Sequence, residues 1–164
     1  MNRRIFFEPL TAEAFAPFGD VLEATGAPDV RINQGLCGRY HNRAKMDFGA
    51  DGRPGLSLFL GVAHTLPLMI DMVERHPDGS QTFIPMHRNP FPVIVAPDAG
   101  GRPGVPRAFM TEPGQGVNLH IGTWHGVLMP LQAPGLFAVV DRIGNTPNLE
   151  EHRFDEPFIV EIQR

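Results

Sequence analysis

The segment LPLMIDMVERHPDGSQ, residues 66–81, carries the most information about the fold. Successive side chains of a β-strand alternate between its two faces, so every second residue from Leu66 to His76 shares one face. That face begins with apolar residues and ends with Glu74 and His76. A Pro-Asp-Gly turn follows, and Gln81 begins the next apolar run. The segment therefore predicts a β-hairpin that brings Glu74, His76 and Gln81 together at the rim of a barrel.

The rest of the chain repeats this pattern of short apolar runs between turn residues. Glycine and proline number 18 and 17 among 164 residues, well above average usage. Regularly punctuated short strands are typical of a sandwich or barrel. One short helix is expected at Ala12 to Ala16, with Thr11 as its N-cap. The predicted strands are Leu56 to Ala63, Leu66 to His76, Gln81 to Pro85, Phe91 to Ala96, Arg107 to Thr111, Val117 to His120, Trp124 to Leu131, Phe137 to Arg142 and Phe158 to Ile162.

Length and composition restrict the class of protein. Residues 1–164 fit a single domain, and neither Gly/Pro-rich loop, Gly49 to Gly55 or Gly100 to Pro106, separates regions of different composition. A formal net charge of −4 argues against a nucleic-acid partner. No run approaches the roughly 18 apolar residues of a membrane span. A single cysteine, Cys37, fits a reducing compartment, so the cytoplasm is the expected location.

Glu74, His76 and Gln81 are candidates for holding a divalent ion. A buried carboxylate is costly unless it is paired or bound to a metal. A pocket of oxygen and nitrogen donors suits a divalent ion. The alternative is that residues 74–76 form a solvated strand end before a tight turn, and these residues alone leave the two interpretations equally open.

A second group of candidates lies between Gly114 and His125. Two histidines, His120 and His125, flank a turn over Gly122, and such a turn would hold both imidazoles near one rim. Asn118 alternates with His120 and so shares its face of the strand. Either histidine alone is more often a strand-end residue than a ligand. Their joint placement between glycines is what favours a functional site.

These two segments resemble the two motifs of the cupin superfamily, which together hold one metal in a small barrel. The first motif reads His-x-His, four residues, then Glu; here Glu-Arg-His stands at 74–76, with Gln81 at the final place. The second contains Pro-x-Gly-x-x-His, matched by residues 120–125 with His120 in place of proline. The resemblance implies an all-β, cupin-type double-stranded β-helix, a jelly-roll-like barrel with one or two short helices. It assigns the metal to Glu74, His76, Gln81 and His125; a metal-free site is the alternative that the replaced residues leave open.

A longer series of motifs runs through the chain in order. It includes FGDV at 18–21, RYH at 39–41, ERHP at 74–77, GQGVN at 114–118 and WH at 124–125. In this series the chain resembles the ureidoglycolate lyases over nearly its whole length. The resemblance implies a homodimer that cleaves ureidoglycolate, a small ureide, into glyoxylate and urea. It also implies a divalent metal, nickel in this family, with zinc and manganese as alternatives.

The implied reaction needs a base, an acid and an anion clamp. Ureidoglycolate is a hemiaminal with a carboxylate, and its C–N bond breaks when the hydroxyl loses a proton and the urea nitrogen gains one. A bound metal would lower the pKa of the hydroxyl. His120 or Glu74 would then take the proton, a role that suits the ordinary pKa of histidine.

Candidate substrate-binding residues come from three parts of the chain. Arg39, beside Tyr40, is the first choice for the substrate carboxylate, because a guanidinium binds a carboxylate in a fork. Arg142 is the second choice, and Asn118 would hydrogen-bond the ureido group. The alternatives are a surface arginine for Arg39 and an ion pair at a strand end for Asp141 with Arg142.

Three other functions compete with the lyase. An amidohydrolase on the same substrate would attack the ureido carbonyl and release ammonia rather than urea. A non-enzymatic cupin would bind a small ligand as a sensor or accessory module. A cupin oxygenase is the weakest alternative, because Glu74 and Gln81 replace two usual ligands of redox iron.

Overall fold

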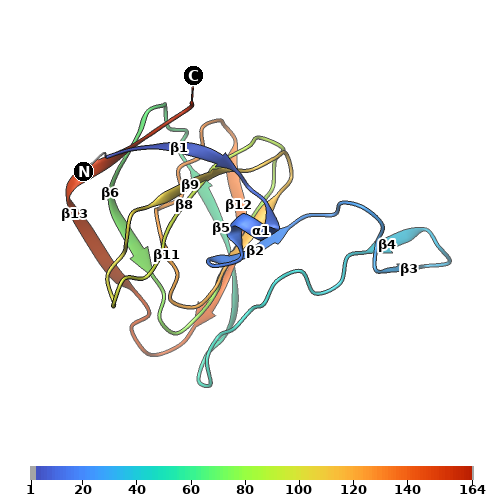
Figure 1. The fold of residues 1–164 in the computed structure, drawn as a ribbon. Coiled ribbons are helices and arrows are strands. Elements are labelled where there is room, and N and C mark those ends of the chain that lie inside the picture. The colour runs from blue at the N-terminus through green and yellow to red at the C-terminus, as the bar shows by residue number, and fades with distance from the viewer. Residues whose placement is uncertain (1–2, 164) are drawn as a thin grey trace.

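Strands make up nearly all regular structure of the chain, whose computed structural model describes residues 3–163 (Figure 1). No helix within that range is long and apolar enough to cross a membrane. The elements in chain order are β1 (Arg4–Pro9), α1 (Ala12–Phe15), β2 (Gly19–Leu22), β3 (Val30–Ile32), β4 (Cys37–Arg39), β5 (Arg53–Gly61), β6 (Leu68–Arg75), β7 (Gln81–Pro85), β8 (Pro92–Ala96), β9 (Arg107–Met110), β10 (Gly116–Leu119), β11 (Trp124–His125), β12 (Gly135–Ile143) and β13 (Glu150–Glu161).

The strands form two main layers and a small arm. Six strands close into a barrel in the order β1-β13-β6-β11-β8-β9, and five more form a sheet in the order β2-β10-β7-β12-β5. The remaining two, β3 and β4, pair only with each other, in an arm that extends away from the barrel (Figure 1). The expectation of an all-β barrel with a short helix is confirmed, and the arrangement is consistent with a cupin-type barrel.

The helix forms where the sequence predicts it. The hydroxyl of Thr11 accepts a hydrogen bond from the backbone of Ala14 at 3.2 Å, as an N-cap does. The helix ends at Phe15, one residue earlier than expected. Ala16 is its C-cap and keeps helical backbone geometry, and Pro17 has no backbone N–H with which to continue the helix. Phe15 is fully buried, so this one turn of helix anchors the chain before β2.

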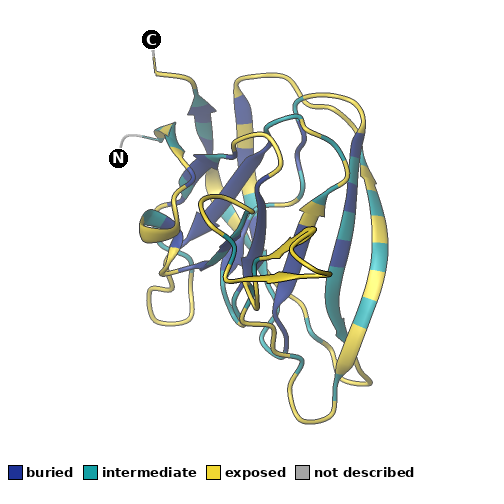
Figure 2. Ribbon diagram, turned by 90° about the vertical axis from the view of Figure 1, so that its right-hand side faces the viewer, coloured by how far each residue is buried: buried dark blue, intermediate teal, exposed yellow. Residues whose placement is uncertain are grey.

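Two hydrophobic clusters stabilise the layers. One lies inside the closed barrel, and the other fills the space between the barrel and the five-stranded sheet. Strand β8 contributes to both, with Ile94 in the barrel cluster and Val93 and Val95 in the cluster between the layers. This double burial explains its continuous apolar sequence. Figure 2 shows the buried strands at the centre and the alternation of exposed and half-buried residues along the outer strands.

The alternation along β6 is interrupted, which differs from the expected strict period of two. Leu68 and Ile70 share the barrel cluster with Val73, so the buried position changes from even to odd residues. The partner strand β13 has a register shift opposite this point, and a bulge of this kind increases the local twist. Glu74, next to Val73, therefore points out of the barrel interior, toward the space between the two layers.

Candidate metal centre and its surroundings

Glu74, His76 and His125 meet at one point, with ligand atoms that all lie within 4.8 Å of one another. Glu74 and His125 are direct cross-strand partners in the pairing of β6 with β11. His76 follows the end of β6, and its ring centroid lies 5.2 Å from that of His125. The strand pairing, rather than a flexible loop, therefore sets the spacing of two of the three donors.

The histidines present unprotonated nitrogens to this point. The Nδ1 of His76 lies 2.7 Å from the carbonyl oxygen of Asn148, and that of His125 lies 3.0 Å from the carbonyl of Gly126. A carbonyl oxygen only accepts, so each Nδ1 carries the hydrogen and each neutral ring has its lone pair on Nε2. Both Nε2 atoms are buried without a hydrogen-bond partner among residues 3–163. A metal ion would satisfy both.

Burial governs the charges of this cluster. It lowers the pKa of His125 to about 4, and the nearby His76 lowers it further, whereas the bond to the Gly126 carbonyl opposes the shift. Burial also raises the pKa of Glu74 above its usual value; Glu151 adds to this rise and His76 opposes it. The cluster therefore disfavours charge on either side chain. A divalent cation would reverse this balance for Glu74 by favouring its ionised form.

Gln81 faces the same space from the other layer. It lies on β7 opposite Leu119, which belongs to the cluster between the layers. Its amide nitrogen donates to Asp141 at 3.3 Å, and its Oε1 is buried with no partner in the described part of the chain. Four predicted ligands thus turn toward one space, and three of them have a buried polar atom that a cation could satisfy. The donor set fits a divalent metal.

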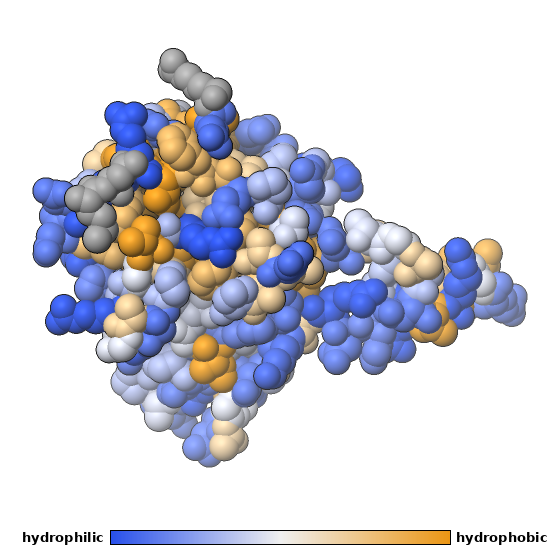
Figure 3. Space-filling view, viewed as in Figure 1, coloured by the Kyte–Doolittle hydropathy of each residue, from blue (hydrophilic) through white to orange (hydrophobic). Residues whose placement is uncertain are grey.

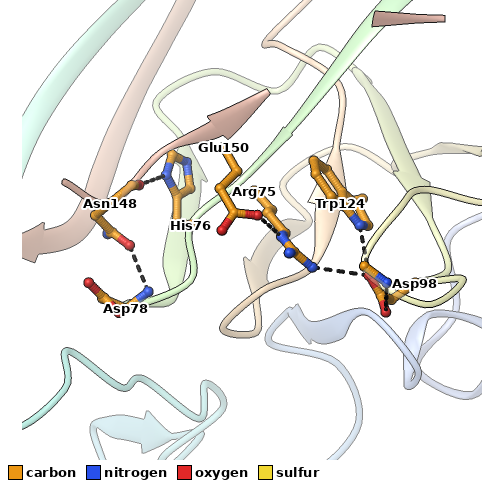
Figure 4. A network of polar contacts seen from close by, with 8 residues as sticks. Arg75, His76, Asp78, Asp98, Trp124, Asn148 and Glu150 are labelled. Carbon is orange, nitrogen blue, oxygen red and sulfur yellow. Dashed lines mark hydrogen bonds and ion pairs between the residues drawn. The ribbon is translucent and has the colours of Figure 1, made fainter. Parts of the chain in front are cut away.

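A polar network on the opposite face holds β11 in place (Figure 4). Trp124 and Arg75 are the neighbours of His125 and Glu74, so they point the other way. The carboxylate of Asp98 accepts from Trp124 Nε1 and from Arg75 Nη1, both at 3.0 Å. The guanidinium carbon of Arg75 also lies 4.4 Å from the centre of the Trp124 ring. Since β11 has only two residues, these contacts keep His125 opposite Glu74.

His120 belongs to a second polar group. Its Nε2 lies 3.1 Å from Asp20 Oδ2. The amide of Asn118 donates to the same carboxylate at 2.9 Å, and its Oδ1 accepts from Thr82 at 2.7 Å. Burial opposes ionisation of Asp20, but the hydrogen bonds from Asn118, the Lys45 backbone and His120 outweigh it and keep the pKa of Asp20 below its usual value. This arrangement favours a carboxylate that orients the His120 ring.

The two groups lie on opposite faces of the five-stranded sheet but adjoin at its edge. Asn118 pairs with Thr82, one residue from Gln81, so its side chain points away from the metal ligands. The backbone N–H of Gly122 donates to the carbonyl of His76 at 2.9 Å, which ties the turn after His120 to the cluster. Beside this turn, a cavity of about 200 Å³ is lined by Lys45, Asp47, His120 and Ile121.

Sequence comparison identifies the family. The family model of ureidoglycolate lyase matches residues 2–161. The ureidoglycolate lyase of Rhodobacter capsulatus is 58% identical over 158 residues, which cover 96% of this chain and 98% of that protein. The chain belongs to the ureidoglycolate lyase family. The protein of that name from Chelativorans sp. is 52% identical over 98% of both chains, and ureidoglycolate lyase 2 of Rhizobium meliloti is 52% identical over 93% of this chain and 94% of its own.

In this member of the ureidoglycolate lyase family, the predicted carboxylate-binding residues do not gather at the cluster. Arg39 and Tyr40 lie on the exposed arm, where the Tyr40 hydroxyl donates to the Gly26 carbonyl at 2.8 Å. Arg142 donates from Nε to the carbonyl of Phe48 at 3.1 Å and so holds the loop before β5. Asp141 instead accepts from Gln81, so Asp141 and Arg142 bind different groups.

In this ureidoglycolate lyase family member, three residues that shape the site are not among those predicted from the sequence. Asp20 falls within the FGDV motif, but its role depends on long-range contact with His120 and Asn118. Thr82 lies within an apolar strand, where its hydroxyl carries no sign of a functional role. Lys45 belongs to no motif, and only the folded chain brings it beside His120.

Proposed function

We propose that the protein is a ureidoglycolate lyase that releases urea and glyoxylate from ureidoglycolate. The observation that carries this proposal is the convergence of Glu74 with two histidines, His76 and His125, whose buried Nε2 atoms have no hydrogen-bond partner in the described part of the chain. The relatives of the chain bear that name along nearly their whole length. A cytoplasmic location goes with this proposal, because the exposed thiol of Cys37 suits a reducing compartment.

A divalent metal would be held by Glu74, His76, Gln81 and His125. Nickel is the first choice by family resemblance, and imidazole with oxygen donors also suits zinc. When bound, the metal would act as a Lewis acid that lowers the pKa of the substrate hydroxyl. Around it, the buried residues of the interlayer core exclude water, and the carbonyls of Asn148 and Gly126 keep each ring in the tautomer that a ligand needs.

The proton transfers are assigned to His120. Asp20, 3.1 Å from His120 Nε2, would orient the ring and stabilise the imidazolium that forms when His120 takes the hydroxyl proton. The same ring would return a proton to the departing urea nitrogen, so base and acid are one group. Glu74 is the alternative base; burial raises its pKa above the usual value, which makes the carboxyl easier to protonate.

Lys45 is the best-placed cation for the substrate carboxylate. It lines the cavity with His120, whereas Arg39 lies on the arm and Arg142 is engaged with Phe48. Asn118 has its amide engaged with Asp20 and Thr82, so it would position the base rather than hold the ureido group.

The experiment is to measure glyoxylate release by metal-free protein and by protein reloaded with nickel, zinc or manganese. Glu74→Ala should abolish metal-dependent turnover, and His120→Ala should lower kcat by roughly 10²- to 10⁴-fold. Arg153→Ala is the matched control, since Arg153 is exposed and forms an ion pair of 3.5 Å with Asp71, away from the cluster. Unchanged turnover in both variants would show that neither Glu74 nor His120 has the role assigned to it. Full activity of the metal-free protein would agree with the proposed lyase activity but would contradict the proposed metal cofactor.

The protein is also proposed to act as a homodimer. The family resemblance suggests this state, and the large apolar side chains exposed on the surface support it.

A further inference from the structure

Asp141 turns its carboxylate toward the space between the two layers. Hydrophilic side chains cover much of the face of the molecule that Figure 3 shows, and a surface of this kind is where carboxylates are usually found. Asp141 is only partly exposed, and it shares the inward face of β12 with Phe137 and Val139, which are fully buried. A carboxylate held partly inside the protein needs a hydrogen-bond donor as its partner.

The donor is the side-chain amide of Gln81 on the neighbouring strand. Strands β7 and β12 are antiparallel, and their pairing includes Val140 with Thr82. The next position in the same register places Asp141 beside Gln81, and the Gln81 Nε2 donates to Asp141 Oδ2 at 3.3 Å. Gln81 is only 6% exposed, so water does not compete freely for this contact. Strand pairing therefore sets the contact between the two side chains.

This contact decides which end of the Gln81 amide faces the metal centre. The two ends of an amide have nearly the same shape, but one end donates hydrogen bonds and the other accepts them. A carboxylate only accepts, so Asp141 holds the NH₂ group and turns Oε1 away from itself. That Oε1 is buried without a hydrogen-bond partner within the described chain, and Gln81 faces the space beside the cluster of Glu74 and the two histidines. A cation in that space would therefore meet the amide oxygen and not the amide hydrogens.

We propose that Asp141 is a positioning residue that holds the Gln81 amide with its oxygen toward the divalent metal. This inference rests on the metal centre of the proposed function, and it adds to that centre a residue that touches neither metal nor substrate. Without Asp141 the amide is free to turn, and its NH₂ group would then meet the cation with the wrong polarity. Partners that orient a metal ligand in this way typically contribute about 10- to 100-fold to metal affinity.

The test is the affinity of the full-length, chelator-treated protein for Ni²⁺ and for Zn²⁺, measured by isothermal titration calorimetry. Asp141→Leu removes the acceptor and should weaken metal binding by about 10- to 100-fold. Asp141→Asn removes the charge but keeps an oxygen that accepts from Gln81, so it should bind the ion at least about fivefold more tightly than Asp141→Leu. Asp71→Leu is the matched control, because Asp71 also lies on a strand but is exposed and pairs with Arg153; it should bind as the wild type does. Circular dichroism checks that each variant is folded.

A double variant separates the positioning of Gln81 from a direct attraction between Asp141 and the ion. Gln81→Leu removes the ligand itself and should weaken metal binding at least as much as Asp141→Leu does. If Asp141 acts through Gln81, adding Asp141→Leu to Gln81→Leu should change the affinity by less than about twofold. A carboxylate that attracted the ion directly would lower the affinity by the same factor in both backgrounds.

A folded Asp141→Leu protein that binds both ions as tightly as the wild type would overturn the proposal. Equal losses in Asp141→Asn and Asp141→Leu would also overturn it, and so would full additivity in the double variant. If Asp141→Leu does not fold, Asp141→Ala removes the acceptor without adding bulk and must give the same loss.

Glyoxylate release is measured separately, so that failure of the proposed function can be told apart. In a wild type that binds Ni²⁺ but releases no glyoxylate, the expected losses would support the role of Asp141 and contradict the lyase activity. In an active, metal-binding wild type, additive losses would contradict the role of Asp141 alone. A wild type that binds neither ion would contradict the metal centre and the role of Asp141 together.

Discussion

His125 should make the metal-free protein less stable as the pH falls. Burial lowers the pKa of His125 from 6.5 to about 4, so the unfolded chain binds this proton more readily than the folded one. The stabilisation is complete above pH 6.5 and is lost as the pH falls toward 4. The shift corresponds to about 3 kcal/mol in all, of which about 2 kcal/mol is lost by pH 5. Glu74 has the opposite shift, since its raised pKa makes protonation easier in the folded state.

The assay is urea unfolding at pH 7.5 and pH 5 with a chelator present, on the wild type and on His125→Asn. Asparagine does not titrate and keeps a donor near the Gly126 carbonyl. The wild type should lose about 2 kcal/mol more than the variant between the two pH values. His76, Glu74 and Glu151, which also face the cluster, are present in both proteins, and the repulsion between His76 and His125 is part of the shift that the comparison measures. Equal losses within about 0.5 kcal/mol would refute the reasoning that buried His125 resists protonation.

Three further variants test other parts of the site. Asn118→Ala should lower the free energy of unfolding by about 3 kcal/mol, because it removes the bonds of the amide to Asp20 and to the Lys45 carbonyl as well as the acceptor of the Thr82 hydroxyl. Thr82→Val removes one bond and should cost only about 1 kcal/mol; urea unfolding that ranks the two variants equally would contradict this. Asp98→Ala should loosen β11 and speed hydrogen exchange of the Gly126 amide while exchange in β12 stays unchanged, and uniform acceleration would mean a global effect. Lys45→Ala should raise the KM for ureidoglycolate more than it lowers kcat. A change in kcat alone would show that Lys45 does not bind the substrate carboxylate.

The fold could be predicted from the sequence because its signals are local. Turn residues between short apolar runs, the Thr11 cap and the alternation in residues 66–81 each depend on neighbours in the chain. The same alternation failed at Val73, where the register shift of β13 changes which face of β6 is buried. A bulge in a partner strand distant in sequence leaves no mark in the β6 sequence itself.

The candidate metal centre was predictable for a similar reason, and the substrate pocket was not. Glu74, His76 and Gln81 lie within eight residues of one another, and His125 follows a turn that matches a known motif. The hairpin predicted for residues 66–81 is wrong, because β6 and β7 lie in different sheets and Gln81 reaches the site from the opposite layer. The face of the sheet on which the Asn118 side chain lies, by contrast, follows from the pairing of Asn118 with Thr82. Residue spacing in the sequence does not reveal this pairing. The guanidinium of Arg39 suits a carboxylate, but the position of this residue on the projecting arm is visible only in three dimensions (Figure 1).

The proposed activity is the elimination of urea from ureidoglycolate. The most direct measurement is to incubate the metal-reloaded protein with racemic ureidoglycolate and to quantify glyoxylate, urea and ammonia together, against the spontaneous rate. Equimolar glyoxylate and urea, without ammonia, are the result expected of the lyase. Ammonia without urea would instead identify an amidohydrolase, and no product above the spontaneous rate would contradict an enzymatic role on this substrate.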